Sequence, residues 1–216
     1  MNTLNLALIP AAVMVLAACS ASPSGTADYD KMTADVVKSS FQAKGIATLD
    51  RLQQDEANRL CNEAEVAGKP LAESVTKAVE AAQLKTVKWP TDGKYLGDWK
   101  AGEKTAQSGR GLSWSDKATD TNGGNCYNCH QITKEEISFG TIGPSLYNYG
   151  KLRGVTDPNS AAAQEVVKYT WGKMWNARGY SACSLMPRFG HNGVLDETQI
   201  KDVMALLLDP ASPVNK

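Results

Sequence analysis

One short stretch, from Cys126 to His130, constrains this chain more than any other part of its sequence. It consists of Cys-Tyr-Asn-Cys-His, so the thiols of Cys126 and Cys129 are three positions apart and an imidazole follows directly. Two thiols at this spacing can each form a thioether to one vinyl-derived carbon of a porphyrin, and the neighbouring imidazole can then bind the iron. The motif therefore predicts one covalently attached c-type haem, with His130 as the proximal iron ligand.

The alternatives for this stretch are half of a zinc site, or a chance pair of cysteines beside a histidine. A zinc site needs two further ligands at similar spacing. The other histidine, His191, and the cysteines Cys61 and Cys183 stand alone in the sequence. The pattern therefore favours haem over zinc.

The length and charge of the chain limit its class. The 216 residues are enough for one sizeable domain, or for a small domain with an extension. Lys and Arg number 23 and Asp and Glu number 23, which gives a formal net charge of +0. A balanced charge, with no basic run between aromatic residues, argues against nucleic acid as a partner.

The N-terminal segment differs in composition from the rest of the chain. Residues 2–18 contain no charged side chain and are rich in Leu, Ala, Val and Met. A short apolar stretch that ends in small residues is typical of an export signal, so residues 1–18 are predicted to be a signal peptide. The absence of Lys or Arg before the apolar run departs from the usual pattern.

The end of this segment, Leu-Ala-Ala followed by Cys19, resembles the lipobox of bacterial lipoproteins. Cys19 would then be the lipidated first residue of the mature protein and would tether it to a membrane. The alternative is an ordinary cleaved signal with an incidental cysteine. Both hypotheses predict export to the periplasm, which agrees with the attachment of bacterial c-type haem outside the cytoplasm.

Two cysteines, Cys61 and Cys183, remain after the haem motif and Cys19 are set aside. In an oxidising compartment, a disulfide that ties an N-terminal segment to the haem region is the simplest use of this pair. The alternatives are two buried free thiols, or a role for Cys183 as an iron ligand or as a link to another chain.

The region before the haem motif is predicted to be a linker followed by a helical extension, together spanning residues 19–95. Residues 20–28 have the Ser, Ala, Pro, Gly and Thr content of a linker. The pattern from there to about residue 85 is helical, with Pro70 as a first-turn residue of one helix. Apolar residues recur at near-helical spacing before that proline, at Leu49, Leu52, Leu60 and Ala64.

Residues 96–216 are expected to form the haem domain. Helices are predicted over Lys100–Gly111 and Ala161–Trp175. Asp196 and Gln199 form a capping-box pattern before a helix with one apolar face. Strand signals are weak throughout, so the sequence predicts an all-α fold.

Low-spin iron needs a second axial ligand on the face opposite the proximal histidine. The candidates are Met174, Met186, Met204, His191 and Cys183. Met174 and Met204 lie in helical stretches, where core packing is their more usual role. Met186 precedes a proline and lies near two glycines, so a loop can present its thioether to iron. Met186 is favoured over His191 and Cys183, with gap-filling in an apolar pocket as its alternative role.

Three segments follow the order of a class I cytochrome c: Cys126–His130, Ile142–Leu146 and Met186–Gly190. The tail from Leu206 to Asn215, which contains Asp-Pro-Ala-Ser-Pro-Val-Asn, closely resembles that of the SoxX family. SoxX is the monohaem cytochrome subunit of the SoxAX thiosulfate-oxidising complex. The resemblance covers roughly residues 96–216 and implies a class I cytochrome c-like haem domain.

The resemblance assigns a role to each matching residue. Cys126 and Cys129 match the thioether positions, His130 matches the proximal ligand and Met186 matches the distal ligand. Pro144 matches a proline whose carbonyl accepts the other N–H of the proximal imidazole. Such a contact fixes the orientation of the ring and increases the basicity of the ligand.

The resemblance also implies a function and partners. A SoxX-like subunit pairs with a SoxA-type dihaem or monohaem cytochrome, and the complex couples thiosulfate oxidatively to a cysteine of the carrier SoxYZ. The chain would be the electron-accepting subunit of this L-cysteine S-thiosulfotransferase, passing electrons to a soluble cytochrome c and carrying none of the substrate chemistry. The alternatives are an independent monohaem carrier that serves a respiratory oxidase, and a haem gas sensor, although no signalling domain accompanies the haem region.

Overall fold

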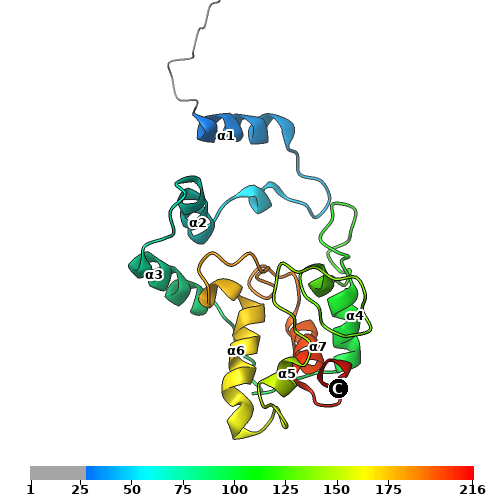
Figure 1. Ribbon diagram of the computed structural model, residues 1–216. Helices are drawn as coiled ribbons and strands as arrows, with labels where there is room; N and C mark the ends of the chain where they lie inside the picture. Colours follow the sequence, from blue (N-terminus) through cyan, green and yellow to red (C-terminus); the bar gives the residue numbers. More distant parts are fainter. Residues whose placement is uncertain (1–27) are drawn as a thin grey trace, which may run out of the picture. The chain divides into compact units, whose positions relative to one another are not determined.

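The computed structural model of the protein describes residues 28–216 (Figure 1). The predicted signal peptide and Cys19 lie outside these residues. The chain divides into two units, one ending at Phe41 and the other spanning Gln42–Lys216. The described part of the first unit is the helix α1 (Tyr29–Ser40), whose N-terminus is capped by the Asp28 carboxylate through the amide of Lys31 at 2.9 Å.

The second unit is built from helices and connecting loops. Its α-helices are α2 (Glu56–Val66), α3 (Glu73–Leu84), α4 (Trp99–Gln107), α5 (Tyr149–Leu152), α6 (Gln164–Trp175) and α7 (Glu197–Leu208). Short 3-10 helices are η1 (Leu49–Leu52), η2 (Cys126–Asn128), η3 (Ala161–Ala163), η4 (Ala177–Gly179) and η5 (Pro213–Asn215). Within residues 28–216 the extended pairing is limited to one isolated bridge between Lys44 and Ala47. The all-α prediction is therefore confirmed for the described residues.

Helix α7 forms where the sequence predicts it and supplies the centre of the core. The Asp196 carboxylate accepts the backbone N–H of Gln199 at 2.8 Å, and the Gln199 side chain accepts the N–H of Asp196 at 3.2 Å. This reciprocal capping box satisfies two N–H groups that would otherwise lack partners at the start of the helix. The apolar face that follows is buried: Ile200, Val203, Met204, Leu206, Leu207 and Leu208.

Helices α4 and α7 cross at close range, and a glycine makes this crossing feasible. A Cβ atom at Gly102 would overlap with the backbone carbonyl of Asp202. The Asp202 carboxylate also accepts the backbone N–H of Asp98 at 2.7 Å, and the N–H of Gly97 donates to the carbonyl of Lys201 at 2.8 Å. The start of α4 is therefore fastened to the middle of α7 by both packing and hydrogen bonds.

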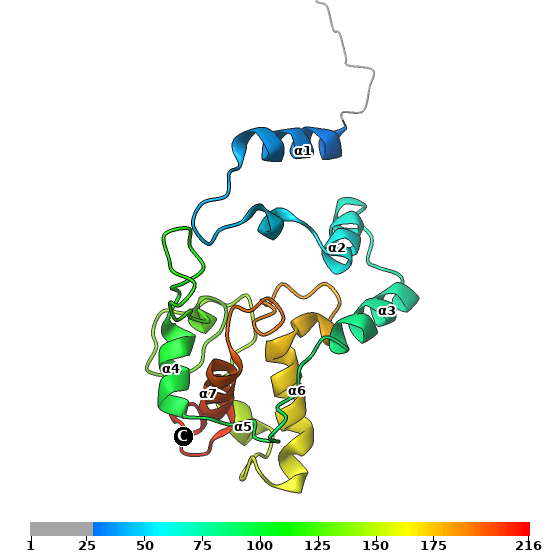
Figure 2. The same ribbon diagram turned by 180° about the vertical axis from the view of Figure 1, so that it is seen from behind.

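Helix α6 completes the main core with two tryptophans. Trp171 is fully buried and stacks on Trp175 with ring centroids 5.9 Å apart. The indole N–H of Trp171 donates to the carbonyl of Lys88 at 2.8 Å, and Val87 is buried in the same cluster. The segment between α3 and α4 therefore runs along α6, as both ribbon views show (Figures 1 and 2).

Helices α2 and α3 belong to the same unit as the haem region but have a small core of their own. Ala57 of α2 and Val79 of α3 are buried together with Ala182, which lies in the loop after α6. The N-terminal extension is thus joined to the segment that leads to Met186. The domain boundary expected near residue 96 stays a prediction.

Two details of the expected elements are wrong. Pro70 precedes α3, which begins at Glu73, because the chain first completes a turn in which the N–H of Lys69 donates to the carbonyl of Ala64. The apolar residues from Leu49 to Ala64 do lie in helical structure, a 3-10 turn and then an α-helix whose start is capped by the carboxylate of Asp55. The helix expected to reach Gly111 ends at Gln107, because the following residue is extended.

In residues 28–216 we find no helix that combines the length and the apolar character needed to cross a bilayer.

Substituting Gly102→Val should destabilise the fold, because the added side chain would force α4 away from α7. We expect a loss of about 3 kcal/mol in the free energy of unfolding. Denaturant unfolding followed by circular dichroism measures this loss. The matched control is Lys104→Val, which adds a β-branched residue at an exposed position of the same helix and should change stability by about 0.5 kcal/mol or less. Because valine has a higher helix propensity than glycine, a loss in the Gly102 variant no larger than that in the control would show that the crossing tolerates a side chain there.

Candidate haem-attachment site

The Cys-Tyr-Asn-Cys-His motif lies on one tight turn. Asn125 enters the turn in the left-handed conformation, with φ of 50°. Helix η2 follows, and the N–H groups of Cys129 and His130 both donate to the carbonyl of Cys126, at 3.1 and 2.9 Å. The two thiols and the imidazole therefore extend from a rigid segment of five residues.

Both motif cysteines are free thiols, and each is half-buried. Burial, and then the neighbouring Cys129, raise the pKa of the Cys126 thiol to about 12. A thiol with such a pKa is protonated at neutral pH and is a poor nucleophile. Cys126 is therefore suited to a structural or attachment role rather than to thiol exchange.

The imidazole of His130 is oriented by the segment that contains Pro144. Its Nδ1 lies 2.7 Å from the carbonyl oxygen of Pro144. A carbonyl can only accept, so Nδ1 carries the proton and Nε2 keeps its lone pair for a ligand. Gly143 packs so closely against the ring that a Cβ atom there would overlap with it. The N–H of Gly143 in turn donates to the carbonyl of Cys129 at 2.8 Å, which ties this segment to the motif.

Tyr127 anchors the motif to α4. Its ring is buried, and its hydroxyl group donates to the carboxylate of Glu103 at 2.8 Å. Burial raises the pKa of Tyr127, and the bond to Glu103 raises it further, although the nearby hydroxyl of Thr133 lowers it. The second residue of the motif thus fixes the turn against the helix that crosses α7.

Two observations test whether this region fits a haem, which is a flat apolar ring with two carboxylates. The indole N–H of Trp175 is buried and has no acceptor among residues 28–216, so it is a donor free for a carboxylate. Large apolar side chains on the loops around the motif and around Met186 are open to solvent: Ile137 is 94% exposed, Ile142 is 78% exposed and Leu185 is 88% exposed. An exposed apolar side chain can be covered by a bound apolar ring. This free donor and these apolar side chains are the features of the described residues that suit a haem.

Two of the five candidates for the second axial ligand lie in the protein core. Met174 on α6 and Met204 on α7 are both buried among the core residues, as the sequence indicated. Met186 differs from them, because it lies outside any helix, is half-buried and packs at the edge of the main core. Its role as an iron ligand stays a prediction.

The remaining two candidates are engaged elsewhere. The Nδ1 atom of His191 lies 3.1 Å from the hydroxyl oxygen of Thr86, which follows α3. Burial, and then the nearby Arg188, lower the pKa of His191 below its usual value. The sulfur of Cys183 is bonded to that of Cys61, so it is not a free thiolate.

The structure contains a disulfide between Cys61 and Cys183, the simplest of the uses that the sequence allowed for this pair. Cys61 lies on α2 and Cys183 lies in the loop after η4, and their Cα atoms are 5.5 Å apart. This separation is within the normal range for a disulfide. In this structure the bond ties the helical extension to the segment three residues before Met186.

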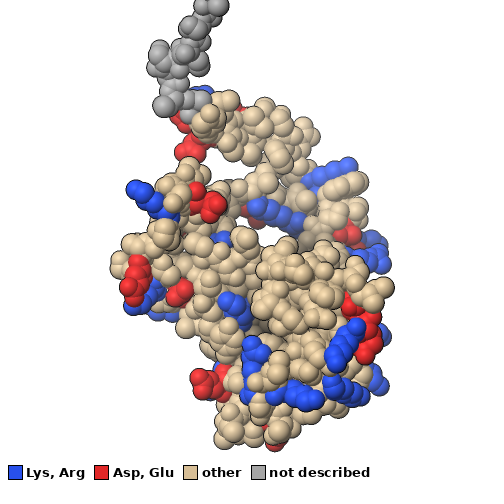
Figure 3. Space-filling model, in the orientation of Figure 1, with Lys and Arg blue, Asp and Glu red and all other residues tan. Residues whose placement is uncertain are grey.

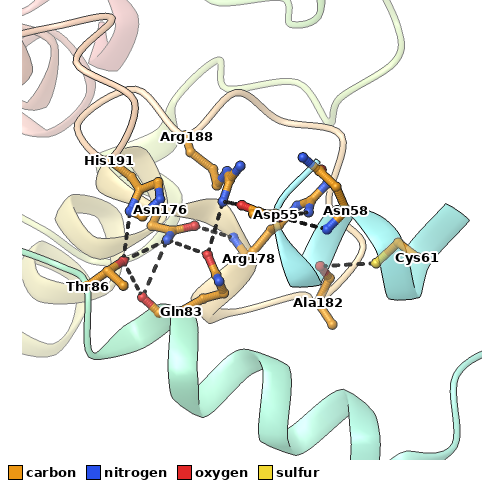
Figure 4. Close-up of polar contacts among 10 residues, drawn as sticks. All are labelled: Asp55, Asn58, Cys61, Gln83, Thr86, Asn176, Arg178, Ala182, Arg188 and His191. Atoms are coloured by element: carbon orange, nitrogen blue, oxygen red, sulfur yellow. Dashed lines mark hydrogen bonds and ion pairs between the residues drawn. The ribbon is translucent and has the colours of Figure 1, made fainter. Parts of the chain in front are cut away.

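Sequence reasoning missed the polar network that Figure 4 shows around Asp55 and Arg188. The Asp55 carboxylate accepts the N–H of Asn58 at 2.8 Å and the guanidinium of Arg188 at 2.5 Å. Burial raises the pKa of Asp55, but these two partners outweigh it and hold the pKa below its usual value. The helix-capping role of Asp55 was detectable, because an acid before a helical pattern is a common N-cap. Its pairing with a residue 133 positions away carried no local signal.

Among residues 28–216, no three His, Cys, Asp or Glu side chains come together in a way that could hold a metal ion.

No family model matches the chain. Over 132 residues, the chain is 39% identical to a protein of Aquifex aeolicus (strain VF5) described as an uncharacterized lipoprotein. The match covers 61% of this chain and 59% of that protein, so the chain spans less than two thirds of the relative's length.

Substituting Gly143→Ala should displace the His130 ring and break its bond to the Pro144 carbonyl, because the new methyl group would occupy the space of the ring. Loss of a partner that orients a metal ligand typically costs about tenfold or more in binding. A displaced imidazole should also hinder attachment of the predicted haem, so we expect the haem-to-protein ratio of the purified chain, measured by absorbance, to fall below that of the wild type. In the control Ser145→Ala, which removes the bonds of this hydroxyl to Gln131 and to the N–H of Tyr147 but no contact to His130, the ratio should not change. A normal ratio in the Gly143 variant would contradict the positioning role of this segment.

Proposed function

We propose that residues 96–216 bind one haem c and that the protein is an electron-transfer cytochrome with a class I cytochrome c-like fold. The observation that carries this proposal is the bond between His130 and the Pro144 carbonyl, formed beside two free thiols on one turn. Cys126 and Cys129 would form the thioethers, and His130 would supply Nε2 as the proximal ligand. This geometry is what the cytochrome motif requires, and a chance arrangement of cysteines would not need an oriented imidazole.

Met186 would be the distal ligand. Support comes from the other candidates, because Met174 and Met204 are core residues, His191 contacts Thr86 and Cys183 is in a disulfide. A thioether ligand favours iron(II) and raises the reduction potential. The bound iron would accept and release one electron.

The surrounding residues would keep water away and leave a surface for partners. Tyr127, Trp175 and Phe189 are buried near the motif or the Met186 loop and provide an apolar environment. On the face drawn in Figure 3, basic and acidic side chains are both present, and a broad uncharged area covers the loops between α4 and α6. With no net charge, partners would dock through local patches and apolar contact rather than through long-range attraction.

We further propose the SoxX-like role that the sequence resemblance implies. The chain would accept electrons from a SoxA-type haem subunit as thiosulfate is coupled to a cysteine of SoxYZ, and would pass them to a soluble cytochrome c. The substrate chemistry would belong to the partner, because the free thiols described here are those of the haem motif.

The proposed location is the periplasm, with a lipid tether at Cys19. The Aquifex protein carries the description of a lipoprotein, and Cys19 follows a lipobox-like segment in this chain. A disulfide between Cys61 and Cys183 is also expected in an oxidising compartment.

Haem binding and its distal ligand can be tested together. The wild-type chain, produced in cells that mature c-type cytochromes, should retain one haem per chain after denaturation, and the double variant C126A/C129A should retain none. Met186→Ala should keep the haem but lose the weak near-infrared charge-transfer band of the oxidised protein. A tenfold weaker preference for iron(II) would lower its potential by about 59 mV. Unchanged optical spectra and potential would refute the assignment of Met186, and a wild-type chain without bound haem would refute the proposal.

The partner assignment has its own test. A SoxA-type cytochrome expressed with this chain should co-purify with it in equal amounts, and the pair should support thiosulfate-dependent transfer to a SoxYZ cysteine. The variant His130→Ala should abolish electron uptake by this chain. Separate elution of the two proteins, with electrons passing from this chain directly to a respiratory oxidase, would instead favour an independent carrier.

A further inference from the structure

The loop that carries Met186 is fastened on both sides to the N-terminal extension. Three residues before Met186, Cys183 is bonded to Cys61 of α2. Two residues after it, Arg188 donates to the carboxylate of Asp55, the N-cap of α2, at 2.5 Å. A covalent bond and an ion pair to the same helix therefore bracket the proposed iron ligand.

Helix α3 and the residues after it strengthen this attachment. The Glu80 carboxylate accepts the backbone N–H of Ala182 at 3.2 Å, and the side-chain oxygen of Gln83 accepts from Arg188 at 3.2 Å. The hydroxyl of Thr86 contacts the imidazole of His191. The close-up in Figure 4 shows Gln83 and Thr86 beside Arg188 and His191 of the loop. The extension thus contacts the loop at several positions between residues 182 and 191.

The contact between Asp55 and Arg188 is sheltered from water. The Arg188 side chain is only 11% exposed, and that of Asp55 is 37% exposed. Arg178 lies nearby, with its guanidinium 3.8 Å from the same carboxylate. Removal of the Asp55 charge would leave the mostly buried Arg188 without this partner, which is more disruptive than the loss of a fully exposed pair. This pair therefore restrains the loop.

Between the two anchors the loop has little support of its own. Leu185 is almost fully exposed. The backbone N–H groups of Ser184 and Met186 bond only to Ser181 and Ser184, within the same loop. Hydrogen bonds confined to one short segment do not hold that segment against the rest of a protein. The backbone of residues 184–186 is therefore fastened through the anchors at 183 and 188, while the Met186 side chain packs at the edge of the main core.

We propose that the extension formed by α2 and α3 is the positioning element for the distal ligand, with Asp55 and Cys61 as its positioning residues. This inference rests on the proposed function, since it presumes that Met186 binds haem iron. The disulfide sets where the loop begins and the ion pair sets where it ends. The thioether between them is thereby held ready in both oxidation states, at little cost in conformational freedom.

The test uses two separate variants of the haem-loaded full chain, Asp55→Asn and C61S/C183S. Asparagine keeps an N-cap oxygen for α2 and removes only the charge that pairs with Arg188. In both variants we expect a normal haem content, a weakened near-infrared band and carbon monoxide binding to the ferrous protein that is about tenfold faster. The control is Glu63→Gln, which removes an exposed ion pair to Arg59 on the same helix and should leave all three readings unchanged.

Hydrogen exchange of the loop gives a second measurement, which does not depend on iron. The amides of residues 184, 185, 186 and 188 should exchange about tenfold faster in both variants than in the wild type. If C61S/C183S fails to fold, Asp55→Asn alone decides the question. A wild-type band, carbon monoxide rate and exchange rate in Asp55→Asn would overturn the positioning role and leave the proposed cytochrome function intact. A wild-type chain that binds no haem would overturn both.

Discussion

The crossing of α4 and α7 at Gly102 is the contact on which the geometry of the proposed haem site depends. Helix α4 precedes the motif, and helix α7 follows the Met186 loop. Because the two helices are in contact, the two ends of the segment between them lie close together. The two backbones can approach because residue 102 has no side chain. All of the proposed haem contacts lie on the loops between these two helices, and the crossing fixes where these loops begin and end.

The two proposed axial ligands are held in different ways. His130 is oriented by Pro144, only 14 residues away, and by a glycine packed against its ring. Met186 lacks such a local partner, and its loop is instead fastened by residues more than 100 positions earlier. The proximal side is therefore a local structure encoded by one stretch of sequence, whereas the distal side forms only when the extension has folded against the loop.

This difference explains what could be predicted from the sequence. The capping box at Asp196 is a local pattern, and the chain forms it as expected. The residues from Cys126 to His130 are also close in sequence, and the chain holds them on one turn. Cysteine counting even suggested the bond between Cys61 and Cys183, because few other partners were left. The pairing of Asp55 with Arg188, like the close approach at Gly102, depends on which distant segments meet in space. Neither helical periodicity nor residue spacing contains that information, so the sequence analysis predicted neither the ion pair nor the close approach of the two helices.

The proposed haem attachment and the distal loop would need opposite oxidation states of their cysteines. Thioether formation at the motif would require reduced thiols there, whereas the loop before Met186 is joined to α2 by an oxidised pair. The structure satisfies both conditions, because the motif thiols stay free while the distant cysteines are bonded. Burial of Cys126, which keeps its thiol protonated, also slows its entry into exchange with the disulfide. The fold can therefore sort four cysteines into two pairs with different chemistry.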